Sequence, residues 1–231
     1  MVRIDIISAV PNLLESPLSH SIVQRAREKG LLEIHIHDLR DYSEDRHKKV
    51  DDYPYGGGAG MVLTAQPIFD CIESLTDERT YDEIIFTAPD GAPYKQKDAN
   101  RLSLLKNLII LCGHYKGVDQ RVRDELITKE YSIGDYVLSG GEIPAMVMAD
   151  SVARLLPGVL GDSESALTDS FQDSLLSAPV YTRPADFRGL KIPDILTSGD
   201  HKKVAEWRRQ ESIRRTEKIR PDLRKQTNRK L

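Results

Sequence analysis

The first 160 residues alternate between short apolar runs and longer stretches whose apolar residues recur at helical spacing. Four runs have the length and the aliphatic content of buried strands, namely residues 4–7, 32–36, 83–87 and 107–112. Between them lie helical stripes such as the one formed by Ile68, Cys71, Ile72 and Leu75. Strands that alternate with helices predict an α/β fold with a mostly parallel sheet covered on both faces.

Capping residues predict where several helices begin and end. Ser16 followed by Pro17 predicts a helix start, and Gly30 predicts the end of that helix. Thr64 is the expected N-cap of the next helix. Further helices are expected at about 98–105 and 118–126, and at 143–156, where Pro157-Gly158 stops the most apolar one.

The chain changes character after residue 160. Residues 161–169 are small, polar and acidic, as in a linker. Beyond them there is no long strand pattern, and Asp200 is the expected N-cap of a basic helix that runs to about residue 219. We therefore predict one large α/β domain followed by a small helical one.

The net charge of −3 hides an asymmetry between the two parts. Residues 183–231 contain 15 Lys and Arg against 7 Asp and Glu, whereas residues 1–182 contain 18 against 29. A basic segment joined to an acidic body favours a polyanion, such as nucleic acid, as the partner of that segment. A solvated charged helix is the alternative interpretation.

The remaining composition argues against several classes of protein. Cys71 and Cys112 each stand in an apolar run, which indicates buried thiols in a reducing compartment. The six histidines show no metal-ligand spacing, so we predict no metal site from them. The first residues predict a strand and not a signal peptide, and no apolar run reaches the roughly 18 residues of a membrane span, so we expect a cytoplasmic protein.

Glycine-bearing loops follow three of the predicted strands. They are Pro89-Asp-Gly91, Gly113-His-Tyr-Lys-Gly117 and the loop that carries Gly134, Gly140 and Gly141. Ligands of open α/β sheets bind beyond the carboxyl ends of the strands, so these loops predict one binding site. The dinucleotide and phosphate-loop fingerprints are missing, and the long polar loop 38–60, which ends in several glycines, also suggests function.

Six motifs in order give the chain a resemblance to a known family. They are Pro54-Tyr-Gly-Gly-Gly-Ala-Gly-Met61, Cys112-Gly-His-Tyr-Lys-Gly117, Ser132-Ile-Gly-Asp-Tyr-Val-Leu-Ser-Gly-Gly-Glu142, Arg154 with Leu156-Pro-Gly-Val-Leu-Gly161, Asp169-Ser-Phe171 and Tyr181-Thr-Arg-Pro184. Along essentially its whole length the chain resembles the bacterial tRNA (guanine-N1)-methyltransferases of the SPOUT superfamily.

The resemblance implies a fold that periodicity does not reveal. It implies a SPOUT-type, mostly parallel sheet with a C-terminal trefoil knot in a catalytic domain over residues 1–160 that binds S-adenosylmethionine. It further implies a flexible linker over 161–171 and a basic helical tRNA-binding domain over 172–231. Two copies are expected to form a homodimer with active sites at the interface. Knots are otherwise rare enough that general topology rules exclude them.

The resemblance also implies the reaction and its residues. S-adenosylmethionine would methylate N1 of guanosine 37 of tRNA, next to the anticodon, with Asp169 as general base and Arg154 stabilising the charge that develops on O6. From the residues alone, Asp169 is also a plausible N-cap of a helix over 171–176, and Arg154 a last-turn cation. The implied cofactor contacts are Pro89, Gly91, Gly113, Tyr115, Ile133, Gly134, Asp135, Tyr136, Val137, Leu138, Gly140 and Gly141.

The chain departs from the family pattern at four positions. Lys116 stands where the family usually has Glu, His114 where it often has Arg, Ala59 where it has Pro, and Tyr53 where it has Arg. Lys116 reverses a charge beside the predicted cofactor loops. The resemblance implies a magnesium requirement, and Lys116 argues against an acidic role for position 116 in meeting it.

Three other functions are weighed against this one. The first is a SPOUT-like enzyme acting on another RNA atom, which the match beyond the first domain disfavours. The second is an RNA-binding protein that senses the cofactor without turnover. The third is an α/β enzyme of nucleotide phosphates, disfavoured because the phosphate-loop pattern is missing.

Overall fold

A computed structural model describes residues 1–160 and 169–227 of the chain. The chain divides into two compact units, Met1–Gly161 and Asp162–Leu231, which we call the N-terminal and the C-terminal unit. Within the described residues, no helix combines the length and the apolar character needed to cross a membrane.

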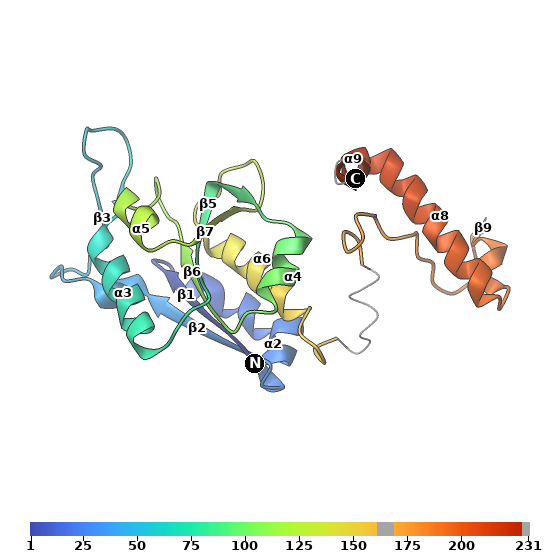
Figure 1. The fold of residues 1–231 in the computed structure, drawn as a ribbon, viewed down its shortest axis with the longest axis horizontal. Helices are drawn as coiled ribbons and strands as arrows, with labels where there is room; N and C mark the ends of the chain where they lie inside the picture. Colours follow the sequence, from blue (N-terminus) through green and yellow to red (C-terminus); the bar gives the residue numbers. More distant parts are fainter. Residues whose placement is uncertain (161–168, 228–231) are drawn as a thin grey trace. The chain divides into compact units, whose positions relative to one another are not determined.

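The N-terminal unit is built on a parallel five-stranded sheet (Figure 1). Its strands lie in the order β2-β1-β6-β5-β7, and every neighbouring pair is parallel. The bounds are β1 Val2–Ser8, β2 Leu32–Asp38, β5 Glu83–Pro93, β6 Asn107–Cys112 and β7 Lys129–Ser132. The predicted α/β fold with a mostly parallel sheet is confirmed.

Helices cover both faces of this sheet (Figure 1). One face carries α1 Asn12–Glu15, α2 Ser21–Glu28, α4 Gln96–Leu102 and α6 Glu142–Ala153, and the other carries α3 Ala65–Glu78 and α5 Gln120–Glu125. Successive strand side chains point to opposite faces. Ile110 of β6 therefore packs in the first core, whereas Ile109 and Leu111 pack in the second.

One of the predicted helix starts is wrong, and two are right. Pro17 begins a short 3-10 turn, Pro17–Ser19, and α2 begins only at Ser21, while Ser16 itself has helical dihedral angles and caps nothing. Thr64 is the N-cap residue of α3, as predicted, although its hydroxyl donates to the carbonyl of Val50 at 3.2 Å and makes no capping hydrogen bond. Asp200 does cap its helix, since its side chain accepts from the N–H of Lys203.

Strand β5 does not end where the apolar run ends. Both Thr87 and Ala92 pair with Tyr131 of β7, so the residues between them bulge out and the strand then resumes. Gly91 returns the chain to the sheet so tightly that a Cβ there would lie 2.7 Å from the N atom of Tyr131. The Pro89-Asp-Gly91 loop is thus a bulge within a strand, not a strand exit.

The chain crosses back over the sheet after β7. It leaves the sheet at its edge and returns to α6, which packs against β6, β1 and α2. At the crossing the N–H of Gly141 donates to the carbonyl of Gly113 at 2.7 Å, and the Thr87 hydroxyl donates to the carbonyl of Gly141 at 3.2 Å. The buried carboxylate of Glu142, which begins α6, accepts a 2.6 Å hydrogen bond from Ser8 at the end of β1.

The polar segment 38–60, expected to be one long loop, contains regular structure. It includes a 3-10 turn, Leu39–Tyr42, and strand β3, Asp51–Asp52, which pairs with β4, Val62–Leu63. The β3–β4 loop projects away from the sheet (Figure 1). Its base is fixed because Leu63 also forms a bridge with Val118, beyond the end of β6.

The C-terminal unit is mainly helical. It contains the hairpin of β8 Asp186–Phe187 and β9 Leu190–Lys191, a 3-10 turn at Asp194–Thr197, the long helix α8 His201–Ile219 and α9 Pro221–Thr227. The segment after Asp169 packs on α8, where the N–H of Leu176 donates to the buried Thr216 hydroxyl at 2.8 Å. No helix forms over 171–176, so the N-cap interpretation of Asp169 is wrong. Most of the predicted linker, residues 161–168, lies outside the described residues.

Candidate functional site

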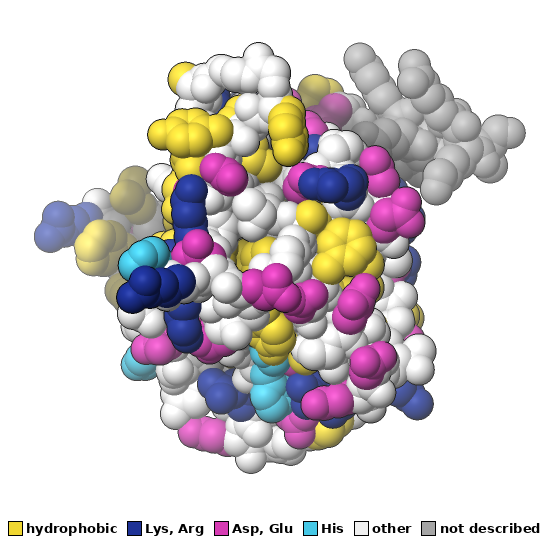
Figure 2. Space-filling view, turned by 90° about the vertical axis from the view of Figure 1, so that its left-hand side faces the viewer, with side chains coloured by type: hydrophobic (Ala, Val, Ile, Leu, Met, Phe, Trp, Pro, Cys, Tyr) yellow, Lys and Arg dark blue, Asp and Glu magenta, His cyan; other side chains and the backbone are white. Residues whose placement is uncertain are grey.

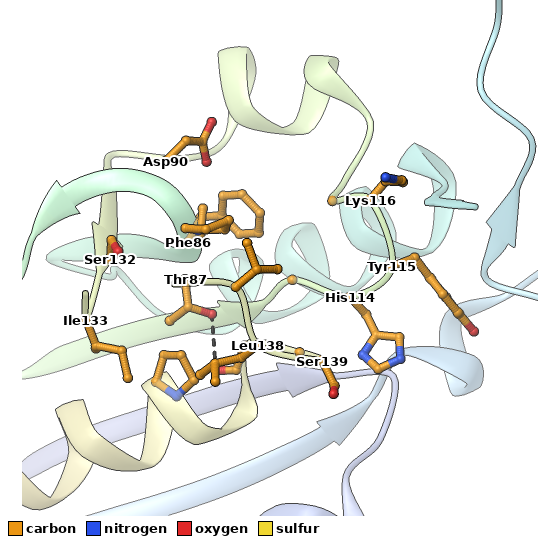
Figure 3. Close-up of a pocket in the computed structure, with 18 of the residues that line it drawn as sticks. Phe86, Thr87, Asp90, His114, Tyr115, Lys116, Ser132, Ile133, Leu138 and Ser139 are labelled. Carbon is orange, nitrogen blue, oxygen red and sulfur yellow. Dashed lines mark hydrogen bonds between the residues drawn. The ribbon is translucent and has the colours of Figure 1, made fainter. Parts of the chain in front are cut away.

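A cavity of about 590 Å³ lies beyond the carboxyl ends of β5, β6 and β7 (Figure 3). The β5 bulge, the loop after β6 and the loop between β7 and α6 line it together. Its size lies in the range of small-molecule sites. The structure therefore gathers the three predicted glycine loops around one cavity.

Ten of the twelve predicted cofactor contacts line this cavity. They are Pro89, Gly113, Tyr115, Ile133, Gly134, Tyr136, Val137, Leu138, Gly140 and Gly141. Gly91 does not, because it packs against the backbone of β7, and Asp135 does not line the cavity either.

Two glycines of the loop before α6 leave no room for a side chain. A Cβ on Gly134 would lie 2.3 Å from Cε1 of Tyr136. A Cβ on Gly140 would lie 2.2 Å from Oε2 of Glu142 and 2.7 Å from Nδ1 of His114. Glycine at these positions keeps the loop compact and leaves its backbone groups at the cavity wall, where they can meet a ligand.

The cavity has apolar walls and one polar end. Phe86, Ile133, Leu138 and Pro144 contribute apolar surface. Ile133 and Lys116 lie on opposite sides in Figure 3. A flat apolar group with polar edges would match the walls and the exposed backbone groups together.

The two cations of the cavity have different surroundings. Arg123 donates to Asp90 at 2.9 Å and to Glu130 at 2.8 Å, and its guanidinium lies 5.5 Å from the centre of the Phe86 ring. The hydrogen bonds that Arg123 donates to Glu130 raise the pKa of Arg123 above its ordinary value, so Arg123 is a fixed structural cation. The exposed Lys116 has no ion-pair partner among the residues that the structure describes.

One buried polar atom in the cavity wall lacks a partner. Nδ1 of His114 makes no hydrogen bond within the described ranges, and its ring packs edge-on against Tyr115. Buried polar atoms are rarely left unsatisfied. Residues 1–160 and 169–227 contain no group of three His, Cys, Asp or Glu side chains arranged to hold a metal ion.

The two predicted catalytic residues, Arg154 and Asp169, belong to different units of the chain. Arg154 is the C-cap of α6, whereas Gly141 at the N-terminal end of the same helix lines the cavity. Because a 12-residue helix is about 18 Å long, Arg154 stands at the far end from the cavity of its own chain. Asp169 belongs to the C-terminal unit, where it lines a hollow with Arg208 and Arg209.

Sequence reasoning missed part of the wall. Phe86 and Thr87 line the cavity at the end of an apolar run, just before the bulge of β5, and Ser132 lines it at the end of β7. Their position at strand ends was a signal that could have identified them. Thr87 has a structural task as well, since its hydroxyl bonds to the carbonyls of Leu111 and Gly141.

Comparison with known proteins gives one consistent result. A family model described as tRNA (Guanine-1)-methyltransferase TrmD matches residues 2–226. A tRNA (guanine-N(1)-)-methyltransferase of Christiangramia forsetii is 62% identical over 222 residues, which cover 96% of this chain and 98% of the relative. Proteins of the same name from Bacteroides thetaiotaomicron and Flavobacterium johnsoniae are 61% and 60% identical, over 96% of this chain and 99% and 98% of their own lengths.

Proposed function

The chain belongs to the TrmD family of tRNA (guanine-N1)-methyltransferases, and on this basis we propose that it methylates N1 of guanosine 37, next to the anticodon of tRNA. The observation that carries the proposal is the family match, which spans nearly the whole chain. Membership also identifies the α/β fold as the knotted SPOUT fold, with small C-terminal helices.

The residues around the cavity fit S-adenosylmethionine. Ile133 and Leu138 offer apolar surface for the adenine faces, and the glycine loops offer backbone groups for its edge. The cofactor supplies a methyl group that is already activated by the sulfonium next to it. The chain therefore has to orient the two reactants and to manage a proton.

The proton on guanine N1 defines the roles of Asp169 and Arg154. At neutral pH this proton is held too tightly to leave unaided, so a general base must remove it as the N1–methyl bond forms. We assign this task to the Asp169 carboxylate. The negative charge that moves to O6 is stabilised by the Arg154 guanidinium.

The position of Arg154 supports an active site shared between two subunits. Since Arg154 lies at the opposite end of α6 from the cavity of its own chain, a second copy is the simplest source of the cation. The outer face of α6 supports the same view, because Ile143 and Val147 are each more than two-fifths exposed. An exposed apolar face on a helix fits a homodimer interface.

The C-terminal unit fits the role of tRNA binding in the cytoplasm. Helix α8 buries only Thr216 among its residues and exposes Lys202, Lys203, Arg208, Arg209, Arg214 and Lys218. Such cations suit the phosphate backbone of an anticodon stem. Asp90, the carboxylate in the cavity wall, accepts a hydrogen bond from Arg123, so we assign it no role as a magnesium ligand.

A mixed-dimer experiment tests the shared site. One variant, Ile133→Asp, places a charge in the apolar wall, and the other, Arg154→Ala, removes the cation. Both are expected to be inactive alone and to remain dimeric. Co-expressed with different affinity tags, they should regain about a quarter of wild-type activity, since half the dimers are mixed and each of these holds one intact site.

The outcome separates the shared site from a site within one chain. If each chain builds its whole site, no mixed dimer contains an intact one and no activity returns. Mixing Ile133→Asp with Ile133→Asp under a second tag is the matched control and should stay inactive. An inactive mixture of the two variants, with mixed dimers purified by both tags, would disprove the shared site.

A second experiment tests the general base. Asp169→Ala should lower turnover roughly 100-fold or more, while binding of S-adenosylhomocysteine stays near the wild-type value. Asp173→Ala is the control, because Asp173 lines the same hollow of the C-terminal unit. Asp169 would be structural, and not the base, if its replacement abolished cofactor binding or unfolded the protein.

A further inference from the structure

The β3–β4 loop carries two aromatic side chains that the fold does not use. Tyr53 is 76% exposed and Tyr55 is fully exposed. A Cβ placed on Gly56, Gly57 or Gly58 would meet nothing within 4 Å, so nothing packs around the tip of the loop. Burial therefore does not explain these two rings.

The same loop is tied to the rim of the cavity. The N–H of Lys116 donates to the carbonyl of Met61, and the N–H of Leu63 donates to the carbonyl of Gly117, each at 3.0 Å. Gly60 lies so close that a Cβ there would be 2.9 Å from Cγ of Lys116. Gly60 and Met61 also line the cavity, so the loop extends its wall outward.

Lys116 brings a cation to this junction. It lies on the side of the cavity opposite Ile133, away from the apolar wall (Figure 3). Unlike Arg123, it has no ion-pair partner in the described part of the chain. Two exposed rings and a neighbouring unpaired ammonium complement a nucleotide, because a ring can stack on its flat base and an ammonium can pair with its phosphate.

The surface view agrees with this arrangement. Figure 2 looks at the molecule from the side of the β3–β4 loop. Hydrophobic side chains gather at the top of this face beside white backbone, and Lys and Arg side chains lie below them. Hydrophobic and cationic side chains thus share this face with Asp and Glu side chains.

We propose that Tyr53, Tyr55 and Lys116, which we call the tyrosine rim, bind the unpaired nucleotide that adjoins the target guanine. The rings stack on its base, and the ammonium pairs with its phosphate. This inference rests on the proposed function, because N1 lies on the Watson–Crick edge and a reachable guanine must be unpaired or extruded. Extrusion removes the stacking partner of the neighbouring base, and an exposed ring replaces it.

The chemistry of the rim predicts what it contributes. Every base has a π-face, so stacking on tyrosine tolerates any base and adds affinity without selecting a sequence. The rim therefore holds the substrate in register beside the cavity, whereas the cavity itself serves the cofactor. The tyrosines and Lys116 are positioning residues for the RNA and take no part in proton transfer.

The test compares two pairs of variants of the full-length protein. Tyr55→Leu removes the ring but keeps an apolar side chain, and Tyr55→Phe keeps the ring. Lys116→Gln removes the cation, and Lys106→Gln makes the same change at an exposed lysine before β6, at the opposite end of the sheet. Each variant is measured for unmodified-tRNA affinity at several salt concentrations, for S-adenosylhomocysteine affinity and for turnover at saturating tRNA.

The expected results are specific. Tyr55→Leu should weaken tRNA binding roughly ten-fold, while Tyr55→Phe stays near the wild type. Lys116→Gln should reduce the slope of log affinity against log salt by about 0.7, the value for one phosphate contact on a single strand, and Lys106→Gln should not. Cofactor affinity and saturated turnover should change less than about two-fold in Tyr55→Leu, Tyr55→Phe and Lys106→Gln.

Other outcomes overturn the proposal. Equal tRNA affinity of Tyr55→Leu and Tyr55→Phe would exclude stacking, and an unchanged salt slope for Lys116→Gln would exclude the phosphate contact. A shift from dimer to monomer in Tyr55→Leu would assign the rim to a second copy of the chain. The wild-type protein is assayed first, so failure to methylate tRNA at all would refute the proposed function separately from the rim.

Discussion

Gly141 is the position where a single added methyl group tests the most of this structure. It lies at the crossing between the β7 edge and α6, and it lines the cavity. In Gly141→Ala the new Cβ would lie 2.1 Å from the Thr87 hydroxyl, 2.6 Å from N of Gly113 and 2.9 Å from Cα of Cys112. Two of these three neighbours are backbone atoms at the end of a buried strand, so they cannot rotate away.

The cost can be estimated from these contacts. Overpacking a tight interior costs about 1–3 kcal/mol. Moving the crossing outward would also break or stretch the hydrogen bonds of Gly141 with Gly113 and Thr87, at roughly 1 kcal/mol each. We expect a total loss of about 3–5 kcal/mol, which for a unit of this size lowers Tm by about 10 °C.

Thermal unfolding and calorimetric titration with S-adenosylhomocysteine check this prediction. Gly30→Ala is the control, because Gly30 has a positive φ of 65° in open space and should cost only about 1–2 kcal/mol without affecting the cofactor. Adding Thr87→Ala to Gly141→Ala should not restore stability, because the two backbone contacts remain. Wild-type Tm and cofactor affinity in Gly141→Ala would refute the reasoning.

Three further predictions concern other parts of the molecule. Burial alone would raise the pKa of Asp5, but hydrogen bonds from His37 and two other side chains hold it well below its ordinary value; Asp5→Asn should cost about 3 kcal/mol at pH 7 in urea unfolding. Because the pKa of Asp5 is lower in the folded state, the stability it contributes is present above about pH 4 and is lost as the pH falls through the folded pKa. The same difference in unfolding free energy between the wild type and Asp5→Asn at pH 7 and in strong acid would contradict this role of Asp5. Burial raises the pKa of Cys71 to about 12 and that of Cys112 well above its ordinary value, so iodoacetamide at pH 8 should label neither thiol before unfolding, and native labelling would argue against their burial. Val147→Asp should lower the molar mass measured by light scattering from that of a dimer to that of a folded monomer. An unchanged mass would show that α6 does not form the dimer interface.

The parts of the fold that depend on local pattern were predictable from the sequence. The apolar run in β6 and the helical stripe of α3 each contain their own signal. The bulge in β5 was not predictable, because it arises from the double pairing of Tyr131, which lies more than thirty residues further along the chain. The start of α2 was missed because Ser16 has helical dihedral angles, which a capping residue does not adopt.

The candidate site shows the same division. The glycine loops could be assigned to one cavity, because parallel strands end on the same edge of a sheet. The crowding at Gly140 could not be predicted, since it depends on His114 in the loop after β6 and on Glu142 at the start of α6. Motif spacing also does not reveal that Arg154 stands a helix length away from the cavity of its own chain.

Methyl transfer to tRNA tests the central claim most directly. Labelled S-adenosylmethionine would be offered with an unmodified tRNA that carries guanosine 37 and with a matched tRNA that carries adenosine there. We predict label with guanosine alone, recovered as 1-methylguanosine. Label in neither tRNA, despite measurable cofactor binding, would contradict the account and favour a protein that binds RNA and cofactor without turnover.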